Sequence, residues 1–193
     1  MIRLFTALPL SQENKDTIRK HLTEKPNVNW TPIQNLHITL NFIGDVNIYQ
    51  FRQIKQQLHA VEVSPVQIEL TEPGVFQTKN QHVVWMGIKK TDGLHKLQQN
   101  IKETLEPFVD SLDSREFKPH LTLARLEKSE EAKLQKLLNS LRDCCKITQA
   151  TRKFTLYASK SSYSGSIYTP LEEYEVPRSR KSGYSPSSVV NML

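Results

Sequence analysis

Two short segments with the same pattern, 83 residues apart, place the strongest constraint on how this 193-residue chain folds. The first reads Asn35-Leu-His37-Ile-Thr39-Leu-Asn-Phe42, and the second reads Lys118-Pro-His120-Leu-Thr122-Leu-Ala-Arg125. Successive side chains of a strand point to opposite faces, so each segment has an aliphatic face and a His/Thr face. A helical pattern follows each segment. We therefore expect two similar halves, whose polar faces meet across a groove if the halves pack side by side.

The apolar spacing along the chain predicts an α+β fold with largely antiparallel sheets. Several neighbouring strands look like hairpins, and this argues against a parallel, doubly wound sheet. Gly44 is expected to end a strand, Pro73-Gly74 and Lys79-Asn80 to form turns, and residues 161–166 to form a loop. Strands are expected at 2–8, 28–30, 36–42, 66–70, 75–76, 82–88, 120–124, 146–149, 153–159 and 167–176, with helices at 11–24, 48–60, 94–108 and from 129.

Length, cysteine content and charge set the broad class. A chain of this length buries a sizeable core without disulfides or metals, and residues 1–177 are expected to form one domain. The adjacent Cys144 and Cys145 close no useful loop, so we expect a reducing, cytoplasmic location. No apolar stretch approaches the roughly 20 residues that span a bilayer, and residues 2–8 suit a buried strand better than a signal peptide.

The net charge of +6 permits a polyanionic partner without requiring one. Half of this charge comes from residues 178–193, which are rich in Ser, Lys and Arg and are expected to form a flexible basic tail. The sequence does not indicate an oligomeric state, and we expect a monomer.

The paired His and Thr residues suit chemistry on a phosphodiester. Two imidazoles on opposite sides of a phosphorus atom can divide the work, one accepting a proton from water and the other protonating the leaving oxygen. The hydroxyl groups of Thr39 and Thr122 can donate to the non-bridging oxygens. Strict alternation turns Arg125 away from this face, so Arg125 joins the site only if its strand twists, bulges or ends there.

Paired histidines also serve as zinc ligands. Two histidines without a nearby set of Cys, Asp or Glu are too few for zinc, so we expect neither metal nor cofactor. His82, which opens a strand, is expected on the solvent side or in a hairpin. The pattern by itself favours a core position for Phe42.

These residues resemble the 2H phosphoesterase superfamily, which is defined by two His-x-Thr/Ser-x motifs. The closer resemblance is to the RNA 2′,3′-cyclic 3′-phosphodiesterase family, also called the 2′-5′ RNA ligase or LigT-like family. Three segments between about residues 2 and 176 carry it: Arg3-Leu-Phe-Thr-Ala-Leu-Pro-Leu10, Val28-Asn-Trp30 with Asn35 to Gly44, and Phe117 to Arg125.

The resemblance implies a bilobal fold of two antiparallel sheets with outer helices and a shared central cleft. It also implies hydrolysis of RNA 2′,3′-cyclic phosphate ends, or of related cyclic nucleotides, to 2′-phosphomonoesters. By this resemblance His37 is the general acid, His120 is the general base, and Thr39 and Thr122 hold phosphate oxygens. Phe42 and Arg125 contact the terminal nucleotide and phosphate. Two other functions stay open: 2′-5′ RNA joining, and a nucleotide- or RNA-binding module that lost turnover.

Overall fold

The computed structural model describes residues 1–23, 28–109, 112–113, 115–142, 147–162 and 165–175. The expected tail at 178–193 and the pair Cys144 and Cys145 lie outside these residues. The described helices are α1 (Gln12–Thr23), α2 (Ile48–Gln57), α3 (Asp92–Leu105) and α4 (Glu131–Arg142). The described strands are β1 (Ile2–Pro9), β2 (Asn29–Trp30), β3 (His37–Val46), β4 (Val66–Gln77), β5 (Gln81–Ile88), β6 (His120–Glu127), β7 (Thr148–Thr151), β8 (Lys153–Ser162) and β9 (Gly165–Glu175).

The described strands form one antiparallel, hydrogen-bonded path. Its order is β7-β4-β5-β6-β3-β1-β8-β9, with β2 paired to β6 beside the path. The expectation of helices with antiparallel strands is confirmed, but the strand pairing joins the two halves into one curled sheet instead of two. The join is narrow, because β3 and β6 are paired only through Ile38 and Leu121 among the described residues.

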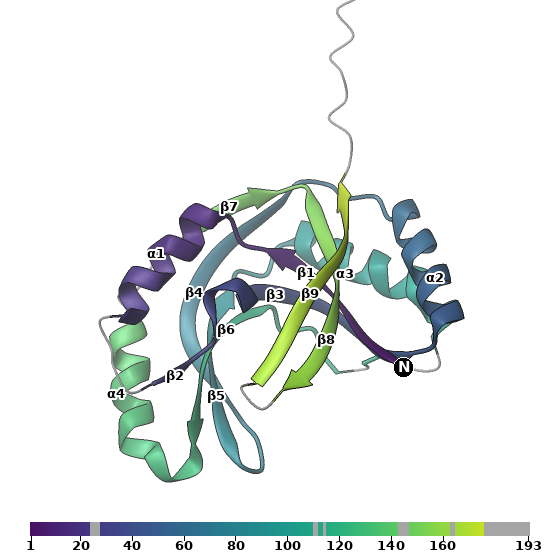
Figure 1. The fold of residues 1–193 in the computed structure, drawn as a ribbon. Coiled ribbons are helices and arrows are strands. Elements are labelled where there is room, and N and C mark those ends of the chain that lie inside the picture. The colour runs from purple at the N-terminus through teal and green to yellow at the C-terminus, as the bar shows by residue number, and fades with distance from the viewer. Residues whose placement is uncertain (24–27, 110–111, 114, 143–146, 163–164, 176–193) are drawn as a thin grey trace, which may run out of the picture.

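The sheet order has an approximate twofold symmetry that reflects the sequence repeat. Moving outward from β3 and β6, the next strands are β1 and β5, then β8 and β4, then β9 and β7. Figure 1 shows β3 and β6 in the middle of the molecule, with α1 and α4 on the left and α2 on the right. The two His-x-Thr strands therefore occupy equivalent central positions.

The helices bury the faces that their sequences predict. Along α3, Leu94, Leu97, Ile101 and Leu105 are fully buried at helical spacing. The Thr91 hydroxyl accepts a hydrogen bond from the Leu94 backbone N–H at the start of this helix.

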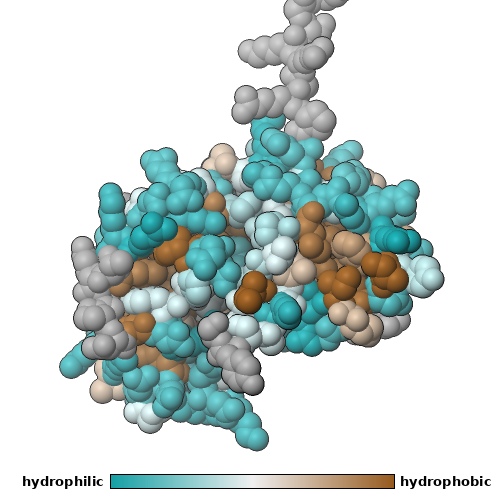
Figure 2. Space-filling view, in the orientation of Figure 1, coloured by the Kyte–Doolittle hydropathy of each residue, from teal (hydrophilic) through white to brown (hydrophobic). Residues whose placement is uncertain are grey.

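No helix in the described part of the chain is long and apolar enough to cross a membrane. Most of the face in Figure 2 is hydrophilic, and hydrophobic residues appear there as small separate patches.

Three segments that we expected to end a strand or to form a turn or loop lie within strands instead. β3 continues past Gly44, which has a positive φ of 88°, to Val46. β4 continues through Pro73-Gly74, with a shift in its pairing to β5 between Leu70 and Pro73. The described residues 161, 162, 165 and 166 extend β8 and β9, so the predicted loop at 161–166 is wrong over those positions. The turn at Lys79-Asn80 is confirmed between β4 and β5.

Candidate active site

A cavity of about 130 Å³ lies between the two motif strands. All six predicted site residues line it, so tertiary structure brings together positions from both halves of the chain. The predicted residues are His37, Thr39, Phe42, His120, Thr122 and Arg125, and the other lining residues are Arg3, Phe5, Thr31, Asn35, Ser159 and Tyr168.

A bulge in β3 places Phe42 in the cavity. Thr6 pairs with Asn41 and Ala7 pairs with Thr39, so Leu40 is an extra residue on its strand. The bulge shifts the alternation by one position, and Phe42 therefore lies on the face of His37 and Thr39. Its side chain is 49% exposed, so the core position that the pattern favoured is wrong.

A second bulge, at the equivalent position of β6, brings in Arg125. Val84 pairs with Ala124 and Trp85 pairs with Thr122, so Leu123 is the extra residue. Leu123 and Ala124 are both buried, and Arg125 emerges on the cavity side. This meets the condition under which the sequence placed Arg125 in the site.

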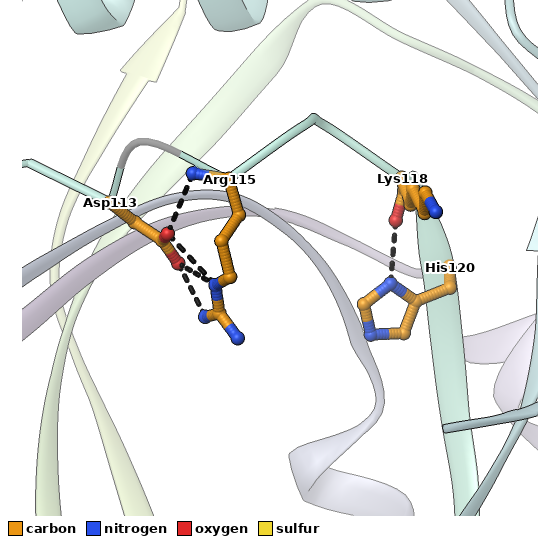
Figure 3. A network of polar contacts seen from close by, with 4 residues as sticks. All are labelled: Asp113, Arg115, Lys118 and His120. Atoms are coloured by element: carbon orange, nitrogen blue, oxygen red, sulfur yellow. Dashed lines mark hydrogen bonds and ion pairs between the residues drawn. The ribbon is translucent and has the colours of Figure 1, made fainter. Parts of the chain in front are cut away.

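Both imidazoles are held by the backbone two residues before them. The Nδ1 atom of His37 lies 2.6 Å from the Asn35 carbonyl oxygen, and that of His120 lies 2.6 Å from the Lys118 carbonyl oxygen. Figure 3 shows the second contact. Because a carbonyl only accepts, each Nδ1 carries the hydrogen, and in the neutral ring each Nε2 is left with a lone pair.

The loop that leads into β6 also contains an ion pair. The Arg115 Nε atom lies 2.9 Å from Asp113 Oδ1 and 3.0 Å from Oδ2, as drawn in Figure 3. The guanidinium beside Asp113 lowers the pKa of that carboxyl group. The pair bridges two residues on the approach to Lys118 and His120.

The two Nε2 atoms differ in their surroundings. The Nε2 atom of His37 lies 3.1 Å from the Thr39 Oγ1 atom, so the hydroxyl donates to the neutral ring. Among the described residues, Nε2 of His120 has no such partner. The His120 nitrogen is therefore the freer of the two to accept a proton.

Aromatic side chains enclose both imidazoles. The ring centroid of His37 lies 4.9 Å from that of Phe5 and 5.1 Å from that of Tyr168, the latter at an interplanar angle of 90°. The His120 centroid lies 4.9 Å from that of Phe76. Sequence reasoning identified none of these three aromatic residues, because each lies on a strand remote from the motif that it contacts.

This enclosure lowers the pKa of both histidines. Burial, assisted by the positive charges of His120 and Lys15, lowers the pKa of His37 to about 4. Burial also lowers the pKa of His120 from its ordinary value. Both imidazoles are therefore neutral at pH 7 in the free protein, since desolvation disfavours the charged form.

The described cavity lining is cationic. Arg125 has no acidic partner among the described residues, whereas Arg3 pairs with Asp45 across β1 and β3, with Nε 3.2 Å from Oδ1. None of the described lining residues is acidic. The cavity therefore suits an anion, which guanidinium and hydroxyl groups bind with charge-assisted hydrogen bonds.

The position of His82 and the possibility of a metal site were also considered in the sequence prediction, and the structure describes both. His82 lies in the β4–β5 hairpin, where it pairs with Gln77, so the hairpin alternative is confirmed. It is only 4% exposed, so the solvent-side alternative is wrong, and its Nε2 atom lies 3.3 Å from the Glu131 carboxylate. It is buried because β5 continues into the pairing with β6, where His82 faces Leu126. The described residues contain no group of three or more His, Cys, Asp or Glu side chains that could hold a metal ion.

Comparison with known proteins identifies the family. A model described as the 2′-5′ RNA ligase superfamily matches residues 9–156. The RNA 2′,3′-cyclic phosphodiesterase of Aquifex aeolicus is 28% identical over 180 residues, covering 90% of this chain and 94% of the relative. The protein of the same name from Aeropyrum pernix is 30% identical over 149 residues, covering 76% of this chain and 85% of the relative. The crystal structure of Escherichia coli LigT in apo form shares the fold, with a TM-score of 0.71 at 24% identity, over 92% of this chain and 98% of that one. The chain therefore belongs to the 2′-5′ RNA ligase superfamily of 2H phosphoesterases.

Proposed function

We propose that this protein hydrolyses 2′,3′-cyclic phosphate ends of RNA to 2′-phosphomonoesters, with His37 and His120 as an acid/base pair and no metal ion. One observation carries the proposal. Both imidazoles line a single cationic cavity, and a backbone carbonyl holds each Nδ1 so that Nε2 is available for proton transfer. The name shared by the relatives, RNA 2′,3′-cyclic phosphodiesterase, supports the same reaction.

The proton transfers follow from the difference between the two Nε2 atoms. His120 accepts a proton from water, and the water oxygen forms a bond to phosphorus. The bond between phosphorus and O3′ breaks, and protonated His37 gives its proton to O3′. The product keeps the phosphate on O2′, and the protein finishes with the proton on His120 in place of His37.

The low pKa of His37 requires that the substrate help to protonate it. At pH 7 the free protein has both rings neutral, so it lacks the proton that O3′ needs. A cyclic phosphate carries one negative charge, and placing it beside His37 favours the imidazolium. Binding and protonation are therefore coupled, and the active form is the complex with His37 charged and His120 neutral.

The remaining predicted residues have binding roles in this proposal. Once His37 is protonated its Nε2 no longer accepts, so the Thr39 hydroxyl is released to donate, with that of Thr122, to non-bridging oxygens. Arg125 supplies a cation free of acidic partners in the described chain. The exposed ring of Phe42 contacts the terminal nucleotide. Selectivity for RNA follows from the substrate, because only a ribose 2′-hydroxyl can close this cyclic phosphate.

A direct assay tests the proposal against the two alternatives. The protein is incubated with EDTA and a short RNA that ends in a 2′,3′-cyclic phosphate, beside a variant with both histidines replaced by alanine. We expect conversion to the 2′-phosphate by the wild type alone. A joined product instead identifies a 2′-5′ ligase, and bound but unchanged RNA identifies a binding module. Conversion that stops in EDTA rejects the metal-independent mechanism.

A further inference from the structure

Asn35 occupies an unusual position between the candidate acid and a distant hairpin. Its side chain is buried, with 9% exposure, and it lines the cavity. Its backbone carbonyl accepts the hydrogen bond from His37 Nδ1, while its side-chain Nδ2 lies 2.9 Å from the Ser166 carbonyl oxygen in β9. Since that carbonyl only accepts, the amide must present its NH₂ group to Ser166. One residue thus contacts both His37 and a segment 131 positions away.

The hairpin that Asn35 contacts carries part of the cavity wall. Tyr168 is two residues beyond Ser166, so the two side chains lie on the same face of β9. The Tyr168 ring meets His37 edge-on and packs at 5.1 Å against Phe5. The position of β9 therefore determines how closely Tyr168 covers the imidazole.

β9 needs such a contact because it is the last strand of the sheet path. In the described structure its strand partner is β8, and its other edge has no neighbouring strand. Its far end is fixed to α2 and the turn after it. The Glu172 carboxylate pairs with Lys55 and His59, and the Tyr174 hydroxyl donates a hydrogen bond to the Lys55 carbonyl oxygen. The near end, where Tyr168 lies, is held across the cavity by Asn35.

We propose that Asn35 is a positioning residue, whose side-chain amide holds the β8–β9 hairpin so that Tyr168 shields His37 from water. This inference builds on the proposed function, because the shielded imidazole is the candidate acid. The backbone carbonyl orients the ring and the side chain sets its enclosure. The two contacts are chemically separate, so a side-chain substitution removes the second and leaves the first.

Shielding has a measurable signature in the titration of His37. Burial is the main cause of its low pKa, so withdrawal of Tyr168 hydrates the ring and raises the pKa toward 6.5. A substitution at position 35 removes none of the other groups around the ring. These groups are His120 on β6, Lys15 on α1 and Tyr157 on β8, with Arg3 and Arg125 further along the cavity.

Two substitutions of Asn35 and one matched control test this role. Asn35→Ala removes the amide, and Asn35→Ser, whose hydroxyl is too short to reach Ser166, is the milder substitute if the alanine protein folds poorly. Asn41→Ala is the control, because Asn41 is similarly buried on β3, at 6% exposure, but does not contact β9 in any described hydrogen bond. Tyr168→Ala removes the shield directly.

The first measurement needs no substrate. NMR titration of the imidazoles and hydrogen exchange of β8 and β9 amides are recorded for each protein. We expect Asn35→Ala to raise the pKa of His37 by about 1 pH unit, within the usual environmental spread, and to accelerate exchange near Tyr168. Asn41→Ala leaves both unchanged. An unchanged pKa of His37 and unchanged exchange in the Asn35 variants would overturn the proposal.

The second measurement uses the RNA cyclic phosphate. Exposure of His37 to water should move the alkaline fall of kcat/KM to higher pH by the same shift of about 1 pH unit, and the weaker acid should lower kcat of the saturated complex by on the order of 10-fold. The double variant Asn35→Ala/Tyr168→Ala should be no slower than the slower single variant, because both changes act through one shield. If the losses of kcat in the two single variants add fully in the double variant, Asn35 does not act through Tyr168. If the wild type has no activity, the proposed function fails, and the NMR experiment still decides the role of Asn35.

Discussion

The pH dependence of kcat/KM follows directly from the enclosure of the two histidines. This ratio reports the ionisation of the free protein, in which the pKa of His37 is about 4 and that of His120 is below its ordinary value. Catalysis needs one proton on the pair, placed on His37. Below both pKa values the pair holds two protons and lacks a base, and above both it holds none and lacks an acid. We expect a bell with its maximum below pH 6.5.

The steepness of the alkaline fall in kcat/KM follows from the same pKa values. At pH 7, about 3 pH units above the pKa of His37, only about one molecule in 10³ carries its proton there. Each further pH unit lowers this fraction tenfold, so kcat/KM should fall about tenfold between pH 7 and pH 8. The alkaline fall of kcat lies at higher pH, because the bound phosphate anion raises the pKa of His37.

The assay follows a fluorescent RNA with a 2′,3′-cyclic end between pH 4 and pH 9, in EDTA and at constant ionic strength. Unfolding is monitored at each pH, so that inactivation at the acidic end is separated from titration. His37→Ala should remove the alkaline fall from any residual activity. A kcat/KM that stays level or rises between pH 7 and pH 8 would refute the assignment of a shielded His37 as the acid.

Three further predictions concern single substitutions. Replacing His37 or His120 by alanine should lower kcat by about 10²- to 10⁴-fold, measured in single turnovers, and retained activity in both variants would exclude the pair. Arg125→Gln should lower kcat/KM about 10- to 100-fold by removing one charge-assisted contact, while urea unfolding stays unchanged. Gly74→Ala should destabilise the fold by about 1–3 kcal/mol in urea, because its Cβ would lie 2.3 Å from the Trp85 ring. Equal stability of that variant would contradict the close packing of β4 on β5.

Much of the site was predictable because its signal is local and repeated. In a strand, residues two positions apart point to the same face, so the shared face of each His and Thr follows from the sequence around His37 and His120 alone. The buried faces of helices such as α3 follow for the same reason. The turn at Lys79-Asn80 was also local, whereas continuation of β4 through Pro73-Gly74 depends on β5 beside it.

The errors arise where strand pairing overrides local pattern. The local pattern favours a core position for Phe42, and strict alternation turns Arg125 away from the site. Both enter the cavity because Leu40 and Leu123 form bulges against β1 and β5. The local pattern places His82 on the solvent side or in a hairpin; it lies in the β4–β5 hairpin, but pairing of β5 with β6 buries it. A bulge depends on the register of two strands that are remote in sequence, so one strand's residues do not specify it.

Residue identity along the chain sets the chemistry available to this protein: two imidazoles, two threonine hydroxyls and an arginine in repeated strands. The environment of these groups depends on how distant strands pack together. The joining of β3 to β6 brings the imidazoles to one cavity, two bulges turn Phe42 and Arg125 toward it, and remote aromatic residues pack against His37. Each residue carries its own side-chain chemistry, whereas its burial, and with it its pKa, depends on neighbours assembled from the whole chain.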